Sequence, residues 1–247
     1  FGIVVFVSLV ARRNEATTAE TISSEDQAKD GMPPSKQISA AIYTASALIG
    51  FVFFTMELVW YRMLAPLLGG STYTLGLILA IALAGIGIGA ALYPLIFRYA
   101  RPTPAAFAIT CLLEAVFIGL PFALGDNLAY LALKLRQTYA SNFTELVTGW
   151  FLVTAIVILP AALVSGVQFP LLIALLGRGR RDVGKQVGRA FAFNTLGAIV
   201  GALLGGFWIL PALTAPGAWV AVVGVLVTLG MVATFAALRN KLQTPIA

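Results

Sequence analysis

The chain has 247 residues, of which 60% are hydrophobic and only 11% are charged. A soluble domain is apolar over about half of its residues and charged over about a quarter, so this composition excludes an ordinary soluble domain and predicts an integral membrane protein. The net charge of +6 does not indicate nucleic-acid binding, because the basic residues lie mainly in short loops between apolar runs, where they set topology. The sequence contains no histidine, which excludes Ser-His-Asp catalysis and most zinc sites, and we expect neither a metal nor a cofactor.

The N-terminal part of the chain divides into an apolar and a polar stretch. Residues 1–13 end in a pair of arginines and are shorter than the about 20 residues that a spanning helix needs, so they predict part of a transmembrane segment, with a cleaved signal peptide as the alternative. Residues 14–37 are too poor in apolar side chains to form a core and predict a cytoplasmic linker. A membrane domain over 38–238 and a cytoplasmic tail over 239–247 are expected to follow.

Six apolar runs in this domain are each near or above the length that a bilayer requires. Their short separations favour antiparallel neighbours, so we predict an all-α, polytopic transmembrane bundle of six full spans. The first and fourth runs are long enough that they must tilt, extend beyond the hydrocarbon or break, and Pro160 and Pro170 predict a kink in the fourth. The runs are 38–66, 73–97, 103–124, 146–176, 189–212 and 217–238.

The loops predict the orientation of these spans. The loop after the fourth run carries five basic residues and only Asp182 as an acid, which places it on the cytoplasmic side. Counting spans from this loop puts the C-terminus on the same side and leaves the uncharged loops 67–72 and 214–217 outside. The longest outer loop, 125–145, has apolar residues at helical spacing and predicts a short amphipathic helix in the interface.

Two sets of glycines recur at every fourth residue of an apolar run: Gly85 and Gly89, and Gly197, Gly201 and Gly205. A helix face without side chains lets a neighbouring backbone approach closely, which is how helices associate in lipid. We therefore interpret both faces as helix-packing faces, the second being central to the bundle. A dinucleotide-binding interpretation of the first set is rejected, since such a motif needs a preceding strand in a βαβ unit.

Two carboxylates, Glu57 and Glu114, are candidate ligand-binding residues. Each is flanked by apolar residues within a predicted span, where a carboxylate costs several kcal/mol unless it is paired, protonated or hydrated. An ion pair with Arg62 is an equally good explanation of Glu57. Glu114 has no basic residue nearby in the sequence, which favours a site or a protonated carboxyl.

Three further polar residues, Gln168, Asn194 and Thr195, are expected toward the cytoplasmic side of adjacent spans. Hydrogen bonds between helices are the simpler interpretation of all three, at about 1 kcal/mol each. Ligand binding is the alternative.

Several segments form a pattern when taken together: 50–62, 68–73, 85–89, 169–170, 188–198 and 205–211, with Asn-Thr-Leu-Gly-Ala from Asn194 as the most specific part. The pattern resembles the multi-spanning membrane region of bacterial spermidine-synthase-like fusion proteins over about residues 40–215. The resemblance implies a bacterial inner membrane, and in that family a cytoplasmic aminopropyltransferase-like domain is commonly attached. Here the sequence ends at Ala247 without a βαβ region, a glycine-rich nucleoside turn or an aspartate base. This ending is consistent with a truncated gene product, a stand-alone membrane relative or a fragment.

These observations predict a protein that is not an enzyme, because no catalytic constellation is found. We expect an accessory or structural subunit that docks in a larger membrane assembly through its glycine-rich faces, with the lipid bilayer and other membrane subunits as partners. The alternative is a transporter or binding protein for cationic, polyamine-like amines, in which Glu57 and Glu114 receive the charge.

Overall fold

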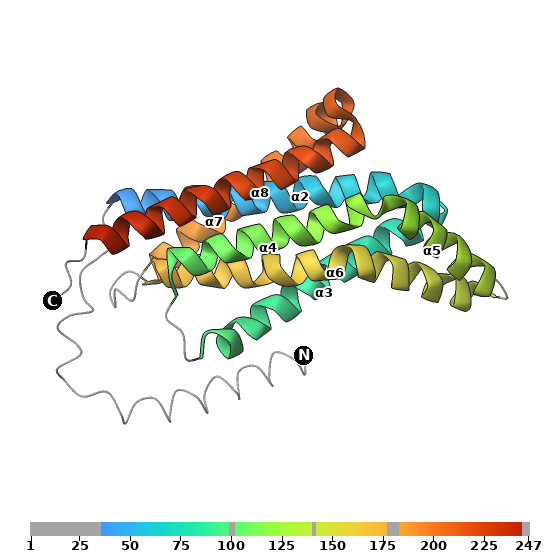
Figure 1. Cartoon of the computed structure of the whole chain (residues 1–247), viewed down its shortest axis with the longest axis horizontal. Coiled ribbons are helices and arrows are strands. Elements are labelled where there is room, and N and C mark those ends of the chain that lie inside the picture. The colour runs from blue at the N-terminus through green and yellow to red at the C-terminus, as the bar shows by residue number, and fades with distance from the viewer. Residues whose placement is uncertain (1–35, 99–101, 140–141, 177–182, 244–247) are drawn as a thin grey trace.

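Every secondary-structure element in the described part of the computed structural model is a helix (Figure 1). The all-α prediction is therefore confirmed for those residues. The predicted N-terminal segment, nearly all of the predicted linker, half of the basic loop that set the orientation and the last four residues of the predicted tail lie outside them. The described residues are 36–98, 102–139, 142–176 and 183–243.

The first four long helices follow the predicted runs within three residues, the last two depart from them by up to eight, and the short helix expected in the longest outer loop is present as α5. Its position in a membrane interface stays a prediction. The fourth predicted run forms one continuous helix through both of its internal prolines. The elements are α2 (Lys36–Leu68), α3 (Thr72–Ile96), α4 (Pro104–Ala123), α5 (Gly125–Thr138), α6 (Phe143–Leu175), α7 (Val183–Leu204), the π-helical turn η1 (Gly205–Ile209) and α8 (Leu210–Gln243).

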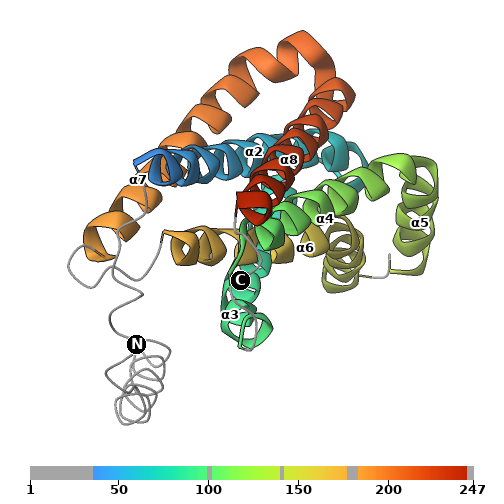
Figure 2. The same cartoon turned by 60° about the vertical axis from the view of Figure 1, so that its left-hand side comes forward.

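Five helical segments are long and apolar enough, by length and composition, to cross a membrane. The last of them, Gly184–Arg239, is 56 residues long and contains α7, η1 and α8, so it includes both the fifth and the sixth predicted runs. Within it, Thr214 has a φ of 60° and a ψ of 173°, and the chain reverses direction near this break (Figures 1 and 2). The helix also continues to Gln243, beyond the predicted start of the tail at 239.

Local sequence signals start several helices. Ser71 and Thr103 accept hydrogen bonds from backbone N–H groups in the first turns of α3 and α4, at 3.4 and 3.1 Å. Asn142 does the same for α6, where its side chain accepts from the N–H of Glu145 at 2.9 Å. Such caps satisfy donors that the helix cannot use itself. The tight turn from α2 to α3 uses Gly69 and Gly70, whose φ values of 87° and 63° favour glycine.

The closest packing joins helices that are far apart in the sequence. On α7, a Cβ at Gly197 would overlap the carbonyl oxygen of Ala47 on α2, and one at Gly201 would overlap that of Phe51. Residue numbers increase together along both helices, so α2 and α7 run parallel. Side chains are small or absent at these contacts, and the two backbones meet directly.

A second close pair consists of α3 and α6. Gly85 on α3 lies against Ala162, and a Cβ at Gly89 would overlap the carbonyl oxygen of Leu163. Here too the numbers increase together, so α3 and α6 run parallel. The third main pair, α4 and α8, is antiparallel: the indole nitrogen of Trp219 donates to the carbonyl oxygen of Ile118 at 2.9 Å, and Gly230 lies near the carbonyl oxygen of Ala108.

These pairings divide the bundle into two corresponding halves, α2–α4 and α6–α8. The first helix of each half has 33 residues, and each packs on the second helix of the other half. Gly50 on α2 and Gly166 on α6 are equivalent, because a Cβ at either would overlap a backbone carbonyl of its paired helix. Pro104 is the first residue of α4, and Pro216 lies at the equivalent point of α8, two residues after the break at Thr214. Since α2 and α6 run in opposite directions, the halves are inverted relative to one another (Figure 1).

Candidate functional site

A hydrogen-bonded acid–amide pair lies between α4 and α6. The Nε2 atom of Gln168 donates to Oε2 of Glu114 at 2.7 Å, and the Ser165 side chain lies beside the Glu114 carboxyl. Glu114 is 2% exposed and Gln168 is fully buried. The sulfur atom of Cys111 lies 4.0 Å from Gln168 Nε2. The pair is therefore a polar centre enclosed by the bundle.

The polar atoms of this centre are incompletely matched. Gln168 Oε1 is buried and has no hydrogen-bond partner among the described residues. Glu114 interacts with hydrogen-bond donors but with no basic side chain in the same part of the chain. A buried acceptor without a donor and a buried acid without a counter-charge are both costly. Together they favour a bound group that is cationic and carries several N–H donors, or a proton on the acid.

Helical spacing assembles this centre from two elements. Cys111 and Glu114 are three residues apart on α4, and Ser165 and Gln168 are three apart on α6, so each pair shares one helix face. The sequence analysis identified Glu114 and Gln168 but missed Ser165 as a contributor. The signal that could have found it is a serine one turn before a glutamine in an apolar run.

Glu57 is not part of this centre. Its side chain is half-buried on α2, and no interaction links it to Glu114 or to Arg62 in the described residues. The ion pair considered for Glu57 and Arg62 is therefore not formed here. Glu57 provides a single carboxylate at an edge of the bundle, without the amide and hydroxyl groups that surround Glu114.

The other two polar candidates lie on α7 and are also separate. The Nδ2 atom of Asn194 donates to the carbonyl oxygen of Ser46 on α2 at 3.0 Å, which is the hydrogen bond between helices that we preferred as an interpretation. Thr195 is exposed. Gln168 is thus the one member of its predicted set that meets a carboxylate.

The five glycines singled out in the sequence lie at contacts inside the bundle. Gly85 and Gly89 face α6, and Gly197 and Gly201 face α2, as described above. Gly205 lies against Thr55 and Leu58 of α2. These faces are therefore occupied by helices of the same chain.

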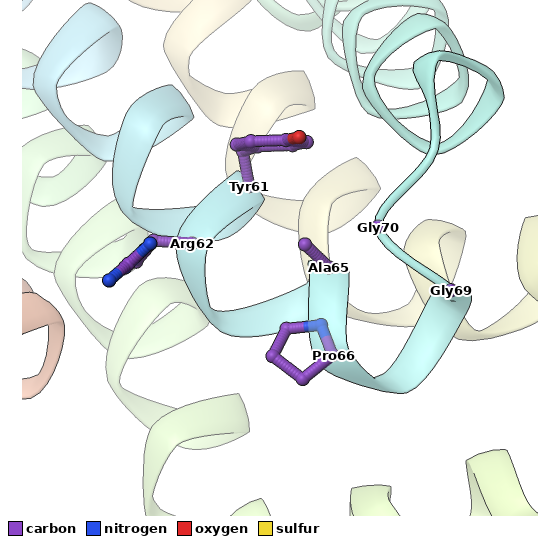
Figure 3. Close-up of a pocket in the computed structure, with 6 residues that line it drawn as sticks. All are labelled: Tyr61, Arg62, Ala65, Pro66, Gly69 and Gly70. Atoms are coloured by element: carbon purple, nitrogen blue, oxygen red, sulfur yellow. The ribbon is translucent and has the colours of Figure 1, made fainter.

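A pocket of about 680 Å³ lies at the α2–α3 turn (Figure 3). Its only charged group is the guanidinium of Arg62, which has no partner among the described residues. A cationic lining offers no counter-charge to an amine. The pocket is lined by Tyr61, Arg62, Ala65, Pro66, Gly69 and Gly70.

Among the described residues, no group of three or more His, Cys, Asp or Glu residues could hold a metal ion. The polar centre at Glu114 therefore offers one carboxylate, one amide, one hydroxyl and one thiol group. Such a set can bind an ammonium group by charge and hydrogen bonding.

The chain is similar to proteins named polyamine aminopropyltransferase. One from Mycobacterium tuberculosis is 29% identical over 182 residues, which cover 72% of this chain and 31% of that protein. One from Corynebacterium efficiens is 31% identical over 178 residues, which cover 70% of this chain and 30% of that protein. The chain thus spans less than a third of the length of these curated relatives. No family model and no solved structure matches it.

These relatives correct one prediction. The sequence analysis expected a protein that is not an enzyme, and that prediction is wrong, because the relatives carry the name of an aminopropyltransferase. The expectation rested on the absence of a catalytic constellation within this chain. Such an absence says nothing about a longer protein in which the matched region is one part. The similarity to polyamine aminopropyltransferases agrees with the resemblance to spermidine-synthase-like proteins.

Proposed function

We propose that the chain is the membrane-embedded module of a polyamine aminopropyltransferase-like protein, and that it binds a cationic amine at Glu114. The observation that carries the proposal is the buried Glu114–Gln168 pair, with its unpartnered amide oxygen and its lack of a basic partner in the described residues. The similarity to proteins named polyamine aminopropyltransferase supports an amine as the ligand class.

The outer surface of the helices supports membrane embedding. Large apolar side chains are exposed over the described bundle, including Phe207 at 75%, Trp208 at 74% and Leu83 at 63%. A soluble monomer rarely exposes such extensive apolar surface, whereas a bilayer covers it. We propose six crossings, with α7 and α8 as two of them, in a bacterial inner membrane. The basic loop and the C-terminus would then be cytoplasmic.

The chemistry of the polar centre favours an ammonium ligand over a purely structural role. A protonated amine would provide the counter-charge that Glu114 lacks and a donor for Gln168 Oε1. Charge-assisted hydrogen bonds of this kind are roughly twice as strong as neutral ones. In the proposed module, the site would hold a polyamine within the membrane region of the longer protein.

The accessory-subunit hypothesis relied on glycine faces as docking surfaces. Those faces pack on α2 and α6 of the same chain, so they do not supply the free surface that such docking needs. Other membrane subunits would have to contact a different face. We therefore prefer the amine-binding module.

Equilibrium binding of labelled spermidine to the purified chain in mild detergent tests the proposal. We expect Glu114→Gln to weaken binding tenfold or more, because a charged hydrogen bond contributes about 1.5–3 kcal/mol, while the fold survives. Glu57→Gln is the matched control and should bind like the parent. Equal binding by Glu114→Gln and the parent, or no binding by a folded parent, would contradict the proposal.

A further inference from the structure

We propose that the two inverted halves of the bundle form a carrier that exposes the Glu114–Gln168 site alternately to the two sides of the membrane. The inference rests on the proposed amine site and adds movement of the amine across the bilayer. It is carried by three features: the inverted repeat, the position of the site between the halves, and the enclosure of the site.

The first feature is the inverted arrangement of α2–α4 and α6–α8. The parallel pairs α2–α7 and α3–α6 each take one helix from either half. If each helix is replaced by its equivalent in the other half, these two pairs exchange places and the antiparallel pair α4–α8 stays the same pair. Such a structure has two nearly equivalent arrangements, in which the halves swap their conformations. Transporters built from inverted repeats use this property to open first to one side and then to the other.

The second feature is the position of the site at the boundary between the halves. Glu114 comes from α4 of the first half, and Gln168 comes from α6 of the second. Glu114 lies near the middle of α4, a 20-residue helix, which by length just crosses a bilayer of about 30 Å. The site is thus near mid-depth, where inverted-repeat transporters bind their substrates.

The third feature is that the site is closed in this structure. Glu114 and Gln168 are at most 2% exposed, so an amine reaches them only if helices separate. The backbone contacts at Gly89 and Gly166 bind α3 and α6 into one tight unit, whereas Glu114 meets Gln168 through side chains alone. The α3–α6 unit can therefore tilt against α4–α8 at the site.

The two ends of the bundle differ. Among the described residues, α2 and α3 pack together beside the tight turn that joins them, and the equivalent helices α6 and α7 pack together less extensively. The α6–α7 contact includes the rings of Phe169 and Phe191, with centroids 6.1 Å apart. Exchange of the two conformations would loosen the α2–α3 end and tighten the α6–α7 end. The site would then change the side from which it can be reached.

Cys111 is a native reporter for this exchange. It is the one cysteine in the 247-residue sequence, it is buried, and its sulfur lies 4.0 Å from Gln168 Nε2. A reagent that modifies Cys111 must therefore have reached the amine site. A cationic, membrane-impermeant methanethiosulfonate forms a mixed disulfide with the thiolate and releases a sulfinate, so no other oxidant is needed.

The experiment uses the chain in vesicles with one orientation, with the reagent supplied either outside or inside. We expect modification of Cys111 from both sides, slowed at least severalfold by saturating spermidine. Cys111→Ser gives the background. Cys111→Ser combined with Asp126→Cys, at an exposed position on α5, should react from one side only and so verifies orientation and the absence of leakage.

Modification from one side only, or from neither side, would overturn the carrier inference. Spermidine binding to the same vesicles separates this failure from failure of the proposed function. If spermidine binds while Cys111 reacts from a single side, the amine site stands and the carrier does not. If spermidine does not bind, both proposals fall.

Discussion

The two halves of the bundle share their packing but differ in polarity at one position. Between α4 and α6 the facing residues are Glu114 and Gln168. The equivalent residues between α8 and α2 are Leu226, ten residues after Pro216, and Val52, two residues after Gly50. Both are buried in one hydrophobic cluster, with exposures of 0% and 1%.

This difference separates what the fold needs from what a ligand needs. The apolar pair shows that the architecture is satisfied by hydrocarbon contacts at this position. A buried acid with an incompletely bonded amide is a costly replacement, and in apolar surroundings such a residue indicates function by default. The polar half therefore holds the candidate site, and the apolar half shows how the same position is packed without a polar pair.

The largest expected effect comes from breaking the packing that both halves share. Gly89→Leu would drive a side chain into the carbonyl of Leu163 on α6, so we expect a loss of stability at or above the upper end of the about 1–3 kcal/mol typical of overpacking. Thermal unfolding in detergent measures it. Gly87→Leu is the matched control on the same helix, because nothing lies within 4 Å of a Cβ there. Equal losses in the two variants would show that the contact at Gly89 does not hold the helices together.

The next prediction replaces the polar pair by the apolar residues found at the equivalent position of the other half. Glu114→Leu alone leaves Gln168 buried without its acceptor and should cost about 1–3 kcal/mol. Adding Gln168→Val gives this half the residues of the other and removes the unsatisfied amide. We expect the double variant to recover most or all of the lost stability, since apolar replacement of a buried polar pair is often neutral or stabilising. A double variant less stable than Glu114→Leu would refute the comparison of the halves.

The smallest effect concerns a hydrogen bond that one half has and the other lacks. The hydroxyl of Thr55 on α2 donates to the carbonyl oxygen of Gly201 at 3.2 Å, whereas the equivalent residue of α6 is Leu171. Thr55→Val should cost about 0.5–1 kcal/mol. Thr228→Val is the control, because its hydroxyl bonds within its own helix and is exposed. A loss no greater than that of the control would make the Thr55 bond unimportant.

Much of the fold could be predicted from the sequence because lengths and periodicities are local properties. Apolar runs predicted α2, α3, α4 and α6 within three residues, and glycines at every fourth residue indicated close-packed faces. The sequence did not show which helix each face meets. The contact of Gly197 with Ala47 depends on three-dimensional pairing of distant segments. The break at Thr214 falls between the fifth and sixth predicted runs, whereas the helical backbone that continues from α7 through η1 into α8 was not predicted.

The candidate site could be predicted in part. An acid in an apolar run is visible in any sequence, and Glu114 was identified in that way. Gln168 was also a candidate, but its pairing with Glu114 could not be predicted, because the two residues are 54 positions apart and Gln168 was grouped with Asn194 by depth alone. Glu57 looked equivalent to Glu114, and only the packing shows that one is half-buried and isolated while the other is enclosed with an amide.

The most direct test of the central claim is spermidine binding by Glu114→Leu combined with Gln168→Val, measured beside its thermal unfolding. The account predicts a variant that is folded, about as stable as the parent, and without measurable spermidine binding. That result would show that the polar pair serves the ligand and not the fold. Spermidine binding at parental affinity by the folded double variant would contradict it.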